Sequence, residues 1–337
     1  MKTFTHRRRK LLGPLNDRSL RSSMLMATFL AIVGWCFAEN TETQSIRLLG
    51  APQLNESSGL GFSFRDLNCV WTHNDSGDRA RLFCFDRTSG EATGRCELPG
   101  VRAIDWEAMA SVPVTKDETA KLIIADCGDN DAVRPFISLY RFDEPDPHDN
   151  TKLDKADCEV LRVRFPGGPV DCEAVWYDPL EECTVLVAKG RLPIAAVYTV
   201  DDSLWEKAAQ RSRTIASSLA EPSRAPEKGA SDPQTVMATQ ITTLALPMAT
   251  GGDRDPLTGD VWIASYFQAF RFPRGEYSRL SDQLGQLPVA TEMPRLRQVE
   301  AIAVDEKGGV WVTTEGSQPL LHPIAPQATD SNATSVD

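Results

Sequence analysis

The sequence predicts an all-β fold, a β-propeller of five or six four-stranded blades. Short strands dominate the chain, a unit of three or four strands recurs five times, and an acidic residue lies near the start of each unit. The strands are rich in β-branched and aromatic residues and end at Gly, Asp, Asn or Pro. Four short strands per repeat, without a sustained helical period, are typical of a propeller blade.

The first 38 residues differ in kind from the rest of the chain. A basic cluster, Arg7 to Lys10, precedes an uncharged apolar run of 15 residues, Met24 to Ala38. This run is shorter than the ~20 residues that a membrane-spanning helix needs. We interpret residues 1–38 as a secretory signal and expect an exported protein, periplasmic or extracellular, without a membrane span after cleavage. The alternative is a protein anchored to the membrane by an uncleaved signal.

The five units follow one another through the rest of the chain. They cover residues 54–86, 104–145, 170–202, 248–275 and 299–325. The opening segment of each unit is apolar on both sides, as expected for an innermost strand packed between neighbouring blades. The segments CEVLRVRF (158–165) and TQITTLAL (239–246) supply fourth strands.

The number of blades stays open between five and six. A sixth blade would be closed by Ser45 to Leu49 pairing near the C-terminus. A pair of β-sandwiches would also explain the strands, but it would not explain the repeat.

Two segments have no strand pattern. Residues 206–234 are rich in Ala, Ser and Pro, and we interpret them as an exposed insertion between strands of the third unit, partly helical at its start. Residues 326–337 are polar and predict a disordered tail. The propeller domain is therefore expected to span residues 39–325.

The composition limits the partners. The formal net charge is −11 and becomes more negative without the basic leader, so the surface repels nucleic acids and favours cations. Cysteines at seven positions between Cys69 and Cys183 follow the leader. Export permits disulfides, but an odd number leaves at least one thiol free, and the pairing cannot be deduced.

The recurring acidic residues predict a metal site on the propeller axis. They are Glu56, Glu107, Glu173, Asp253 and Glu300. First strands line the central channel of a propeller, so equivalent carboxylates would converge there and repel one another unless a cation compensated them. Oxygen ligands favour calcium or magnesium over zinc, and calcium tolerates a wide, irregular site better than magnesium does. Each acid could instead accept backbone hydrogen bonds from the next blade, or pair with Arg or Lys.

Polar residues at the ends of the second strands are expected at the same face. The candidates for binding are Asn74, Asp75, Asp129, Asn130, Lys189 and Glu315. His73, one of four histidines, is the candidate general base or acid. Asp75 and Asp129 lie in Asn-Asp-Ser-Gly and Gly-Asp-Asn contexts, where a turn role explains them equally well.

The chain resembles a family of secreted, mostly uncharacterised bacterial β-propeller proteins. The resemblance is carried by ESSGL (56–60), WTHNDSGD (71–78), DWEAMA (105–110), CGDN (127–130), TGGD (250–253), VEAIA (299–303) and TTEG (313–316). More distantly, it is similar to the phytase-like and gluconolactonase-like propellers. That similarity implies axial carboxylates that hold calcium at the channel mouth, but it carries no activity over.

Two functional classes remain open at this stage. One is a binding or scaffold protein in which calcium fastens the blades and the loop face holds a small molecule, a glycan or a protein. The other is a calcium-dependent hydrolase of ester, lactone or phosphoester bonds, with an axial acid or His73 moving the proton. The hydrolase hypothesis requires an open coordination position beside His73, and a lysine or arginine in the channel would weigh against it. Propellers host both classes, so the fold does not choose between them.

Overall fold

The computed structural model describes residues 44–113, 119–190, 193–208 and 235–325 of the 337-residue chain. The predicted signal at 1–38, the predicted tail at 326–337 and most of the predicted insertion at 206–234 lie outside these residues. Among the described residues, no helix is both long enough and apolar enough to cross a membrane.

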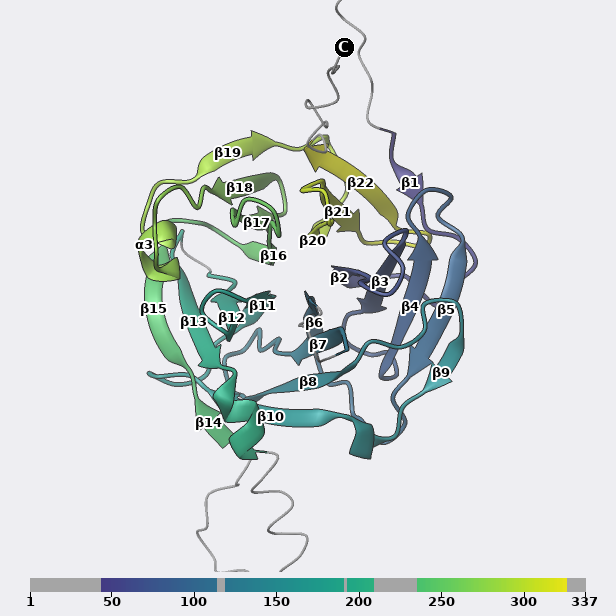
Figure 1. Ribbon diagram of the computed structural model, residues 1–337, viewed down its shortest axis with the longest axis horizontal. Helices are drawn as coiled ribbons and strands as arrows, with labels where there is room; N and C mark the ends of the chain where they lie inside the picture. Colours follow the sequence, from purple (N-terminus) through teal and green to yellow (C-terminus); the bar gives the residue numbers. More distant parts are fainter. Residues whose placement is uncertain (1–43, 114–118, 191–192, 209–234, 326–337) are drawn as a thin grey trace, which may run out of the picture. The chain divides into compact units, whose positions relative to one another are not determined.

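The described chain forms five antiparallel blades arranged in a ring, so the prediction of a β-propeller is confirmed with five blades rather than six (Figure 1). The innermost strands are β2 (Ser57–Phe62), β6 (Trp106–Val112), β11 (Cys172–Asp178), β16 (Ala249–Arg254) and β20 (Val299–Val304). Each packs against the inner strand of the next blade, and β20 packs against β2, so the ring is closed.

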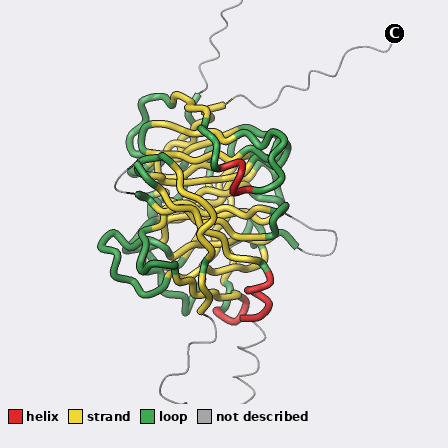
Figure 2. Tube along the Cα trace, turned by 90° about the vertical axis from the view of Figure 1, so that its left-hand side faces the viewer, coloured by secondary structure: helices red, strands yellow, loops and turns green. Residues whose placement is uncertain are grey.

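Second and third strands follow by short antiparallel connections in every blade. The second strands are β3 (Cys69–Asn74), β7 (Lys121–Asp126), β12 (Cys183–Ala188), β17 (Val261–Ser265) and β21 (Val310–Thr314). The third strands are β4 (Arg81–Asp86), β8 (Ile137–Asp143), β13 (Ala195–Asp201), β18 (Gln268–Phe272) and β22 (Leu320–Ala325). In Figure 2 the connecting loops gather at the two opposite sides of the strand layer, where the channel opens.

The outermost strands show how the ring closes. They are β5 (Ala92–Glu97), β10 (Glu159–Arg164), β15 (Thr239–Leu244), β19 (Val289–Glu292) and β1 (Ile46–Arg47). The predicted fourth strands at 158–165 and 239–246 are thus present as β10 and β15. The N-terminal β1 pairs with β22, with Ile46 opposite Leu321. The predicted pairing of Ser45 to Leu49 near the C-terminus is therefore present, but it completes the fifth blade instead of forming a sixth.

Two outer edges receive an additional strand from the following blade. Strand β9 (Asn150–Lys152) pairs in parallel with β5, and β14 (Thr235–Met237) pairs in parallel with β10. A short helix at 203–208 follows β13, and the rest of the predicted insertion up to residue 234 lies outside the described residues, so its extent stays a prediction. The remaining short helices are η1 (Lys155–Asp157) and α3 (Leu280–Leu284).

The core is divided among the interfaces between blades. Five clusters of buried apolar side chains exist, and each joins one consecutive pair of blades. This arrangement explains why the inner strands are apolar on both faces, which a sandwich with one solvated face would not require. The seven described cysteines are buried and free, so none of them forms the disulfides that export would permit.

Candidate functional site

A β-bulge occurs at the same place in all five inner strands and turns one residue per blade toward the axis. The ladder to the second strand skips one residue near the start of each inner strand. The skipped residues are Ser58, Glu107, Glu173, Thr250 and Glu300. A bulge leaves its extra residue outside the ladder and re-aims its side chain, which is why bulges are frequent beside functional sites.

This register corrects the expectation of five equivalent carboxylates. Glu107, Glu173 and Glu300 occupy equivalent bulges, but the first blade has Ser58 there and the fourth has Thr250. Glu56 lies two residues earlier, in an isolated bridge with Glu315. Asp253 lies beyond its bulge, paired with Trp262 in the regular ladder. Aligning the units on their acids could not detect the bulges, because a bulge is a property of strand pairing.

Other acids surround these bulges at one mouth of the channel. Asp105 and Asp171 stand two residues before the bulges of their blades, as Glu56 does. Asp75, Lys189 and Glu315 follow the second strands, and their amides bond to the carbonyls of Glu56, Asp171 and Gln298. The carboxyl groups of this mouth, which we call the acidic mouth, are Glu56, Asp75, Asp105, Glu107, Asp171, Glu173, Glu300 and Glu315.

Three of these carboxyl groups converge most closely. Asp75, Asp105 and Glu107 each place one oxygen within 4.8 Å of the oxygens of the other two. Gly128 makes this approach possible, because a Cβ there would lie 2.4 Å from Asp105 Oδ2 and 2.7 Å from Glu107 Oε1. The hydroxyl of Ser58 donates to Glu107 Oε2 over 3.2 Å and to its carbonyl over 3.0 Å. The backbone therefore leaves room for a compact set of oxygen atoms.

The charge on this set is unfavourable without a cation or protons. Burial, together with the charges of Glu173, Asp75 and Asp105, raises the pKa of Glu107 to about 10. Burial raises the pKa of Asp105 to about 6, with Asp75 adding to the effect, and burial also raises the pKa of Asp75. At neutral pH the empty site therefore holds at least one proton, on Glu107.

Glu173 is compensated differently, by a lysine in the channel. Lys189 Nζ lies 2.6 Å from Glu173 Oε1 and 5.7 Å from the centre of the Tyr266 ring. Burial raises the pKa of Glu173 to about 7 although the ammonium opposes this shift. Burial disfavours the charged ammonium, but the charge and hydrogen bond of Glu173 prevail and raise the pKa of Lys189.

Glu300 is compensated by a proton and lies near the same lysine. Burial, together with the charge of Glu315 and a hydrogen bond with it, raises the pKa of Glu300 to about 8. The fourth bulge residue, Thr250, is 1% exposed, and its hydroxyl finds no hydrogen-bond partner within the described chain. A buried polar atom on the ring of bulge residues is thus left for a water molecule or a ligand to satisfy.

His73 lies in the packing between the first two blades. Its side chain is fully buried, its Nδ1 donates to the carbonyl of Asn74 over 2.8 Å, and its ring packs edge-on against Trp106. A Cβ at Gly59 would lie 2.1 Å from His73 Nε2, so the ring fills the space that this glycine leaves. Burial lowers the pKa of His73 to about 4, and the imidazole is neutral at neutral pH.

The other predicted binding residues lie around the acidic mouth in mostly local roles. Asn74 accepts hydrogen bonds from the amides of Asn55 and Glu56 and donates to Gln53 and Asp78. Asp129 accepts from the amides of Val133 and Arg134 and so closes its own loop.

The remaining predicted binding residues in the first three blades are Asn130, Asp75 and Lys189, and only some of them contact the carboxyl groups of the acidic mouth. Asn130 is exposed at the start of the Asp129 loop. Asp75 bonds the amide of Ser76, a turn contact, but also belongs to the three converging carboxylates. Lys189 reaches Glu173. The structure therefore brings Asp75 and Lys189 to the charged centre.

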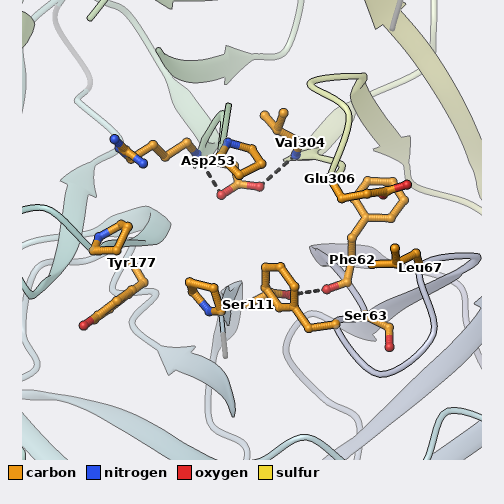
Figure 3. Close-up of a pocket in the computed structure, with 13 residues that line it drawn as sticks. Phe62, Ser63, Leu67, Ser111, Tyr177, Asp253, Val304 and Glu306 are labelled. Carbon is orange, nitrogen blue, oxygen red and sulfur yellow. Dashed lines mark hydrogen bonds between the residues drawn. The ribbon is translucent and has the colours of Figure 1, made fainter. Parts of the chain in front are cut away.

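Asp253 lies away from this centre, at the other mouth of the channel. Its carboxylate accepts hydrogen bonds from the amides of Arg254 over 2.7 Å and of Val304, in the next blade, over 2.8 Å. This is the blade-pinning contact named above as the alternative to metal binding. Asp253 also lines a cavity of about 210 Å³ between loops of all five blades (Figure 3).

Sequence reasoning missed Asp105, Asp171, Ser58 and Thr250. The spacing of Asp105 and Asp171 from Glu107 and Glu173, as Asp-x-Glu in both blades, was a signal that could have identified the first two. Nothing in the sequence marks Ser58 or Thr250, because their equivalence to the glutamates follows from the bulges.

Comparison with known proteins identifies no family for this chain. No protein-family model and no curated protein matches the chain. A chain of a nidogen/laminin complex matches at 14% identity with a TM-score of 0.44, covering 79% of this chain and 74% of that one. A glucose dehydrogenase matches at 10% identity with a TM-score of 0.46, and the match covers 84% of this chain and 100% of that one. Chaetomium thermophilum Raptor matches at 10% identity with a TM-score of 0.34, and the match covers 85% of this chain and 22% of that one. The fold assignment rests on the strand topology of the chain itself, and membership of a secreted bacterial family stays a prediction.

Proposed function

We propose that this protein is an exported binding or scaffold propeller whose acidic mouth holds one Ca²⁺ ion through Asp75, Asp105 and Glu107. The observation that carries the proposal is the convergence of these three carboxyl groups, with Glu107 only 5% exposed, around the space that Gly128 leaves open. Export rests on the leader sequence alone, and the partner that the loop face would bind stays undefined beyond a small molecule, a glycan or a protein.

The ligand type favours calcium or magnesium, and the irregular set of loop and strand carboxylates favours calcium. Calcium accepts flexible coordination by about six to eight oxygens, whereas magnesium demands a near-ideal octahedron. The oxygens of the three acids lie within 4.8 Å of one another, which is close enough for all three to contact one ion. The hydroxyl of Ser58 already contacts Glu107 and can orient it. Water molecules would complete the coordination, which is usual for calcium sites on surface loops.

Calcium would do two things for this fold. It would replace the proton that Glu107 otherwise retains, and it would tie the first blade, which carries Asp75, to the second, which carries Asp105 and Glu107. Loss of the ion would leave adjacent carboxylates to repel one another or to take up protons. The site is therefore expected to stabilise the ring and to fix the loops of this face for ligand binding.

The hydrolase hypothesis receives less support from the geometry. Lys189 lies in the channel and neutralises Glu173, which is the circumstance that weighs against it. His73 is buried in the packing between blades and is neutral, so it presents no ring nitrogen to a metal-bound substrate. The binding or scaffold class is therefore the better supported of the two.

Isothermal titration of the metal-free protein with Ca²⁺ tests the proposal. We expect one site, with an affinity of about 10⁻⁴ to 10⁻³ M as in extracellular modules, and the release of about one proton per ion at pH 7.5. Proton release is measured by repeating the titration in buffers of different ionisation enthalpy. Glu107→Gln should abolish the heat of Ca²⁺ binding. Glu276→Gln, which changes an exposed acid in the loop before α3, should leave it unchanged. Binding of equal strength in both variants would show that the negative surface holds calcium nonspecifically.

A further inference from the structure

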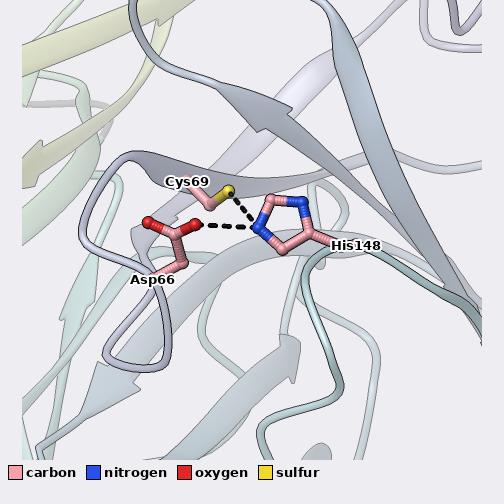
Figure 4. Close-up of side chains that lie close together, drawn as sticks. All are labelled: Asp66, Cys69 and His148. Atoms are coloured by element: carbon pink, nitrogen blue, oxygen red, sulfur yellow. Dashed lines mark hydrogen bonds and ion pairs between the residues drawn. The ribbon is translucent and has the colours of Figure 1, made fainter.

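A second group of metal-ligating side chains lies at the opposite end of the first blade. Asp66 lies in the turn before β3, Cys69 is the first residue of β3, and His148 comes from the segment between β8 and β9 (Figure 4). His148 Nε2 lies 2.8 Å from Asp66 Oδ2 and 3.9 Å from Cys69 Sγ. One ligand atom of each residue lies within 4.8 Å of the other two. Cys69 and Asn74 end the same strand, so this group is separate from the acidic mouth.

The arrangement differs from that of a nucleophilic triad. In a triad the acid contacts the ring nitrogen that faces away from the nucleophile, and so orients the histidine. Here the carboxylate and the thiol both face Nε2 of His148. Three donor atoms that face a common point are instead the arrangement of ligands around a metal ion.

Local hydrogen bonds hold each ligand in place. Asp66 accepts the amide of Asn68 on Oδ1 over 2.9 Å, which leaves Oδ2 toward His148. The carbonyl of Asp66 accepts the amide of Cys69, which fixes the distance between these two residues along the chain. Thr93 donates to the carbonyl of Pro147 over 2.7 Å and thereby fastens the segment before His148 to the edge of the first blade.

We propose that Asp66, Cys69 and His148 form a Zn²⁺ site with a fourth position open to water. Thiolate and imidazole ligands favour zinc over calcium or magnesium, and three protein ligands plus water are a common zinc coordination. On binding, Zn²⁺ forms a bond to the Cys69 sulfur and the thiol proton passes to solvent. The ion would join the β2–β3 turn to the segment that carries β9, and so fasten the parallel strand at the outer edge of the first blade. This inference does not rest on the calcium proposal.

Titration of the full chain with Co²⁺, followed by optical spectroscopy, tests the zinc site. We expect a thiolate-to-cobalt charge-transfer band, visible bands of four-coordinate intensity, and loss of both when Zn²⁺ is added. Cys69→Ser should abolish the charge-transfer band, and His148→Ala should weaken binding at least tenfold. Cys158→Ser, at a buried thiol elsewhere, is the matched control and should retain the spectrum.

Two results would overturn the zinc assignment. One is the absence of a thiolate band in the wild-type protein. The other is an unchanged spectrum in His148→Ala, a variant at an exposed loop position that decides the question even if Cys69→Ser fails to fold.

The cavity at the Asp253 mouth carries a second, independent inference. Among its charged lining residues, Arg254 lies 3.5 Å from Asp178 and Glu306 lies 3.2 Å from Arg87. Among the described residues, the Asp253 carboxylate accepts hydrogen bonds from the backbone amides of Arg254 and Val304, and the side chain lines the cavity (Figure 3). Phe64, Tyr177 and three prolines add apolar wall.

We infer that this cavity binds a small organic ammonium ion with an aromatic or apolar body. The carboxylate would receive the charged group, and the aromatic rings would pack against the body and favour a cation near their faces. The volume of about 210 Å³ is below the range of drug-sized ligands and suits a ligand of one ring.

Matched probes test this inference without relying on a variant. Benzylammonium chloride should raise the melting temperature and give a saturable titration, whereas benzyl alcohol and benzoate at the same concentration should not. Asp253→Asn should lower the affinity for benzylammonium at least tenfold. Equal binding of the charged and neutral probes, or no binding of benzylammonium, would overturn the assignment.

Discussion

Replacing Glu107 by Gln should stabilise the metal-free protein at high pH, whereas most mutations in a buried site lower stability. Glu107 is 5% exposed, and burial raises its pKa to about 10, with Glu173, Asp75 and Asp105 adding to the effect. A glutamine has nearly the size and polarity of a protonated glutamic acid, so below the ordinary glutamate pKa of 4.5, where the unfolded wild type also holds the proton, the variant and the wild type should differ by less than about 1 kcal/mol. At higher pH the wild type alone must hold a proton or a charge at this position.

The magnitude follows from the proton that the folded state retains. The unfolded chain loses the Glu107 proton near pH 4.5, whereas the folded protein keeps it up to about pH 10. Between these values the folded state binds one more proton than the unfolded state, so stability falls by about 1.4 kcal/mol per pH unit as the pH rises. From pH 5.5 to 8.5 the loss sums to about 4 kcal/mol as an upper limit, because neighbouring carboxyls share the charge. Glu107→Gln lacks this loss.

Urea unfolding at pH 5.5 and 8.5, with chelator and then with Ca²⁺, measures the effect. In chelator the variant should be more stable than the wild type, and its advantage should be up to about 4 kcal/mol larger at pH 8.5 than at pH 5.5. With Ca²⁺ at 100 times its dissociation constant the wild type should gain about 2.7 kcal/mol, and the variant should gain nothing. Parallel pH dependence of the two proteins in chelator would refute the reasoning, because Glu107 would then carry no extra proton in the fold.

Three further predictions concern the glycine, the lysine and the closure of the ring. Gly128→Ala places a methyl group against Asp105 and Glu107 and should weaken Ca²⁺ binding at least tenfold by calorimetry, with a smaller change of the melting temperature in chelator. Lys189→Met leaves Glu173 buried without its partner and should cost about 3 kcal/mol at pH 8.5 but less at pH 5.5, where Glu173 is protonated. The double variant with Glu173→Gln should recover most of that loss, and no recovery would mean that the pair is not coupled. Leu48→Ala, beside β1 and 2% exposed, should cost about 2–5 kcal/mol in urea unfolding, whereas Leu287→Ala, 88% exposed, should change stability by less than about 0.5 kcal/mol.

The sequence was sufficient for the architecture because a blade is a local unit. Short β-branched and aromatic strands, turn residues and the repeat of apolar opening segments depend on neighbours in the chain, and they predicted a propeller whose strands include 158–165 and 239–246. The number of blades was harder to predict from the sequence, since the last blade takes its outermost strand, Ile46–Arg47, from the other end of the chain. A pairing between residues that lie 275 positions apart leaves no local pattern.

Some residues of the candidate site were likewise predictable from local sequence, whereas others depended on strand pairing and packing. Glu107, Glu173 and Glu300 were recognisable because each precedes an alanine in an apolar strand, and their convergence follows from the propeller geometry. Asp253 was misplaced because it was aligned on Thr250-Gly251-Gly252 without a Glu-Ala core, and it lies past the bulge of its strand. His73 was selected for its chemistry, and its burial beside Trp106 depends on how the first two blades pack.

The sequence by itself determined the strand pattern, the repeat and the excess of carboxylates in the opening strands. The tertiary structure alone decided which side chains share the axis, because each bulge shifts the register by one residue and a shift of one residue turns a side chain to the opposite face of a strand. It also decided how each acid is compensated. Lys189 reaches Glu173, Glu315 reaches Glu300, and Gly128 leaves the space in which Asp75, Asp105 and Glu107 meet. These contacts join different strands or blades, and only the closed ring brings them together.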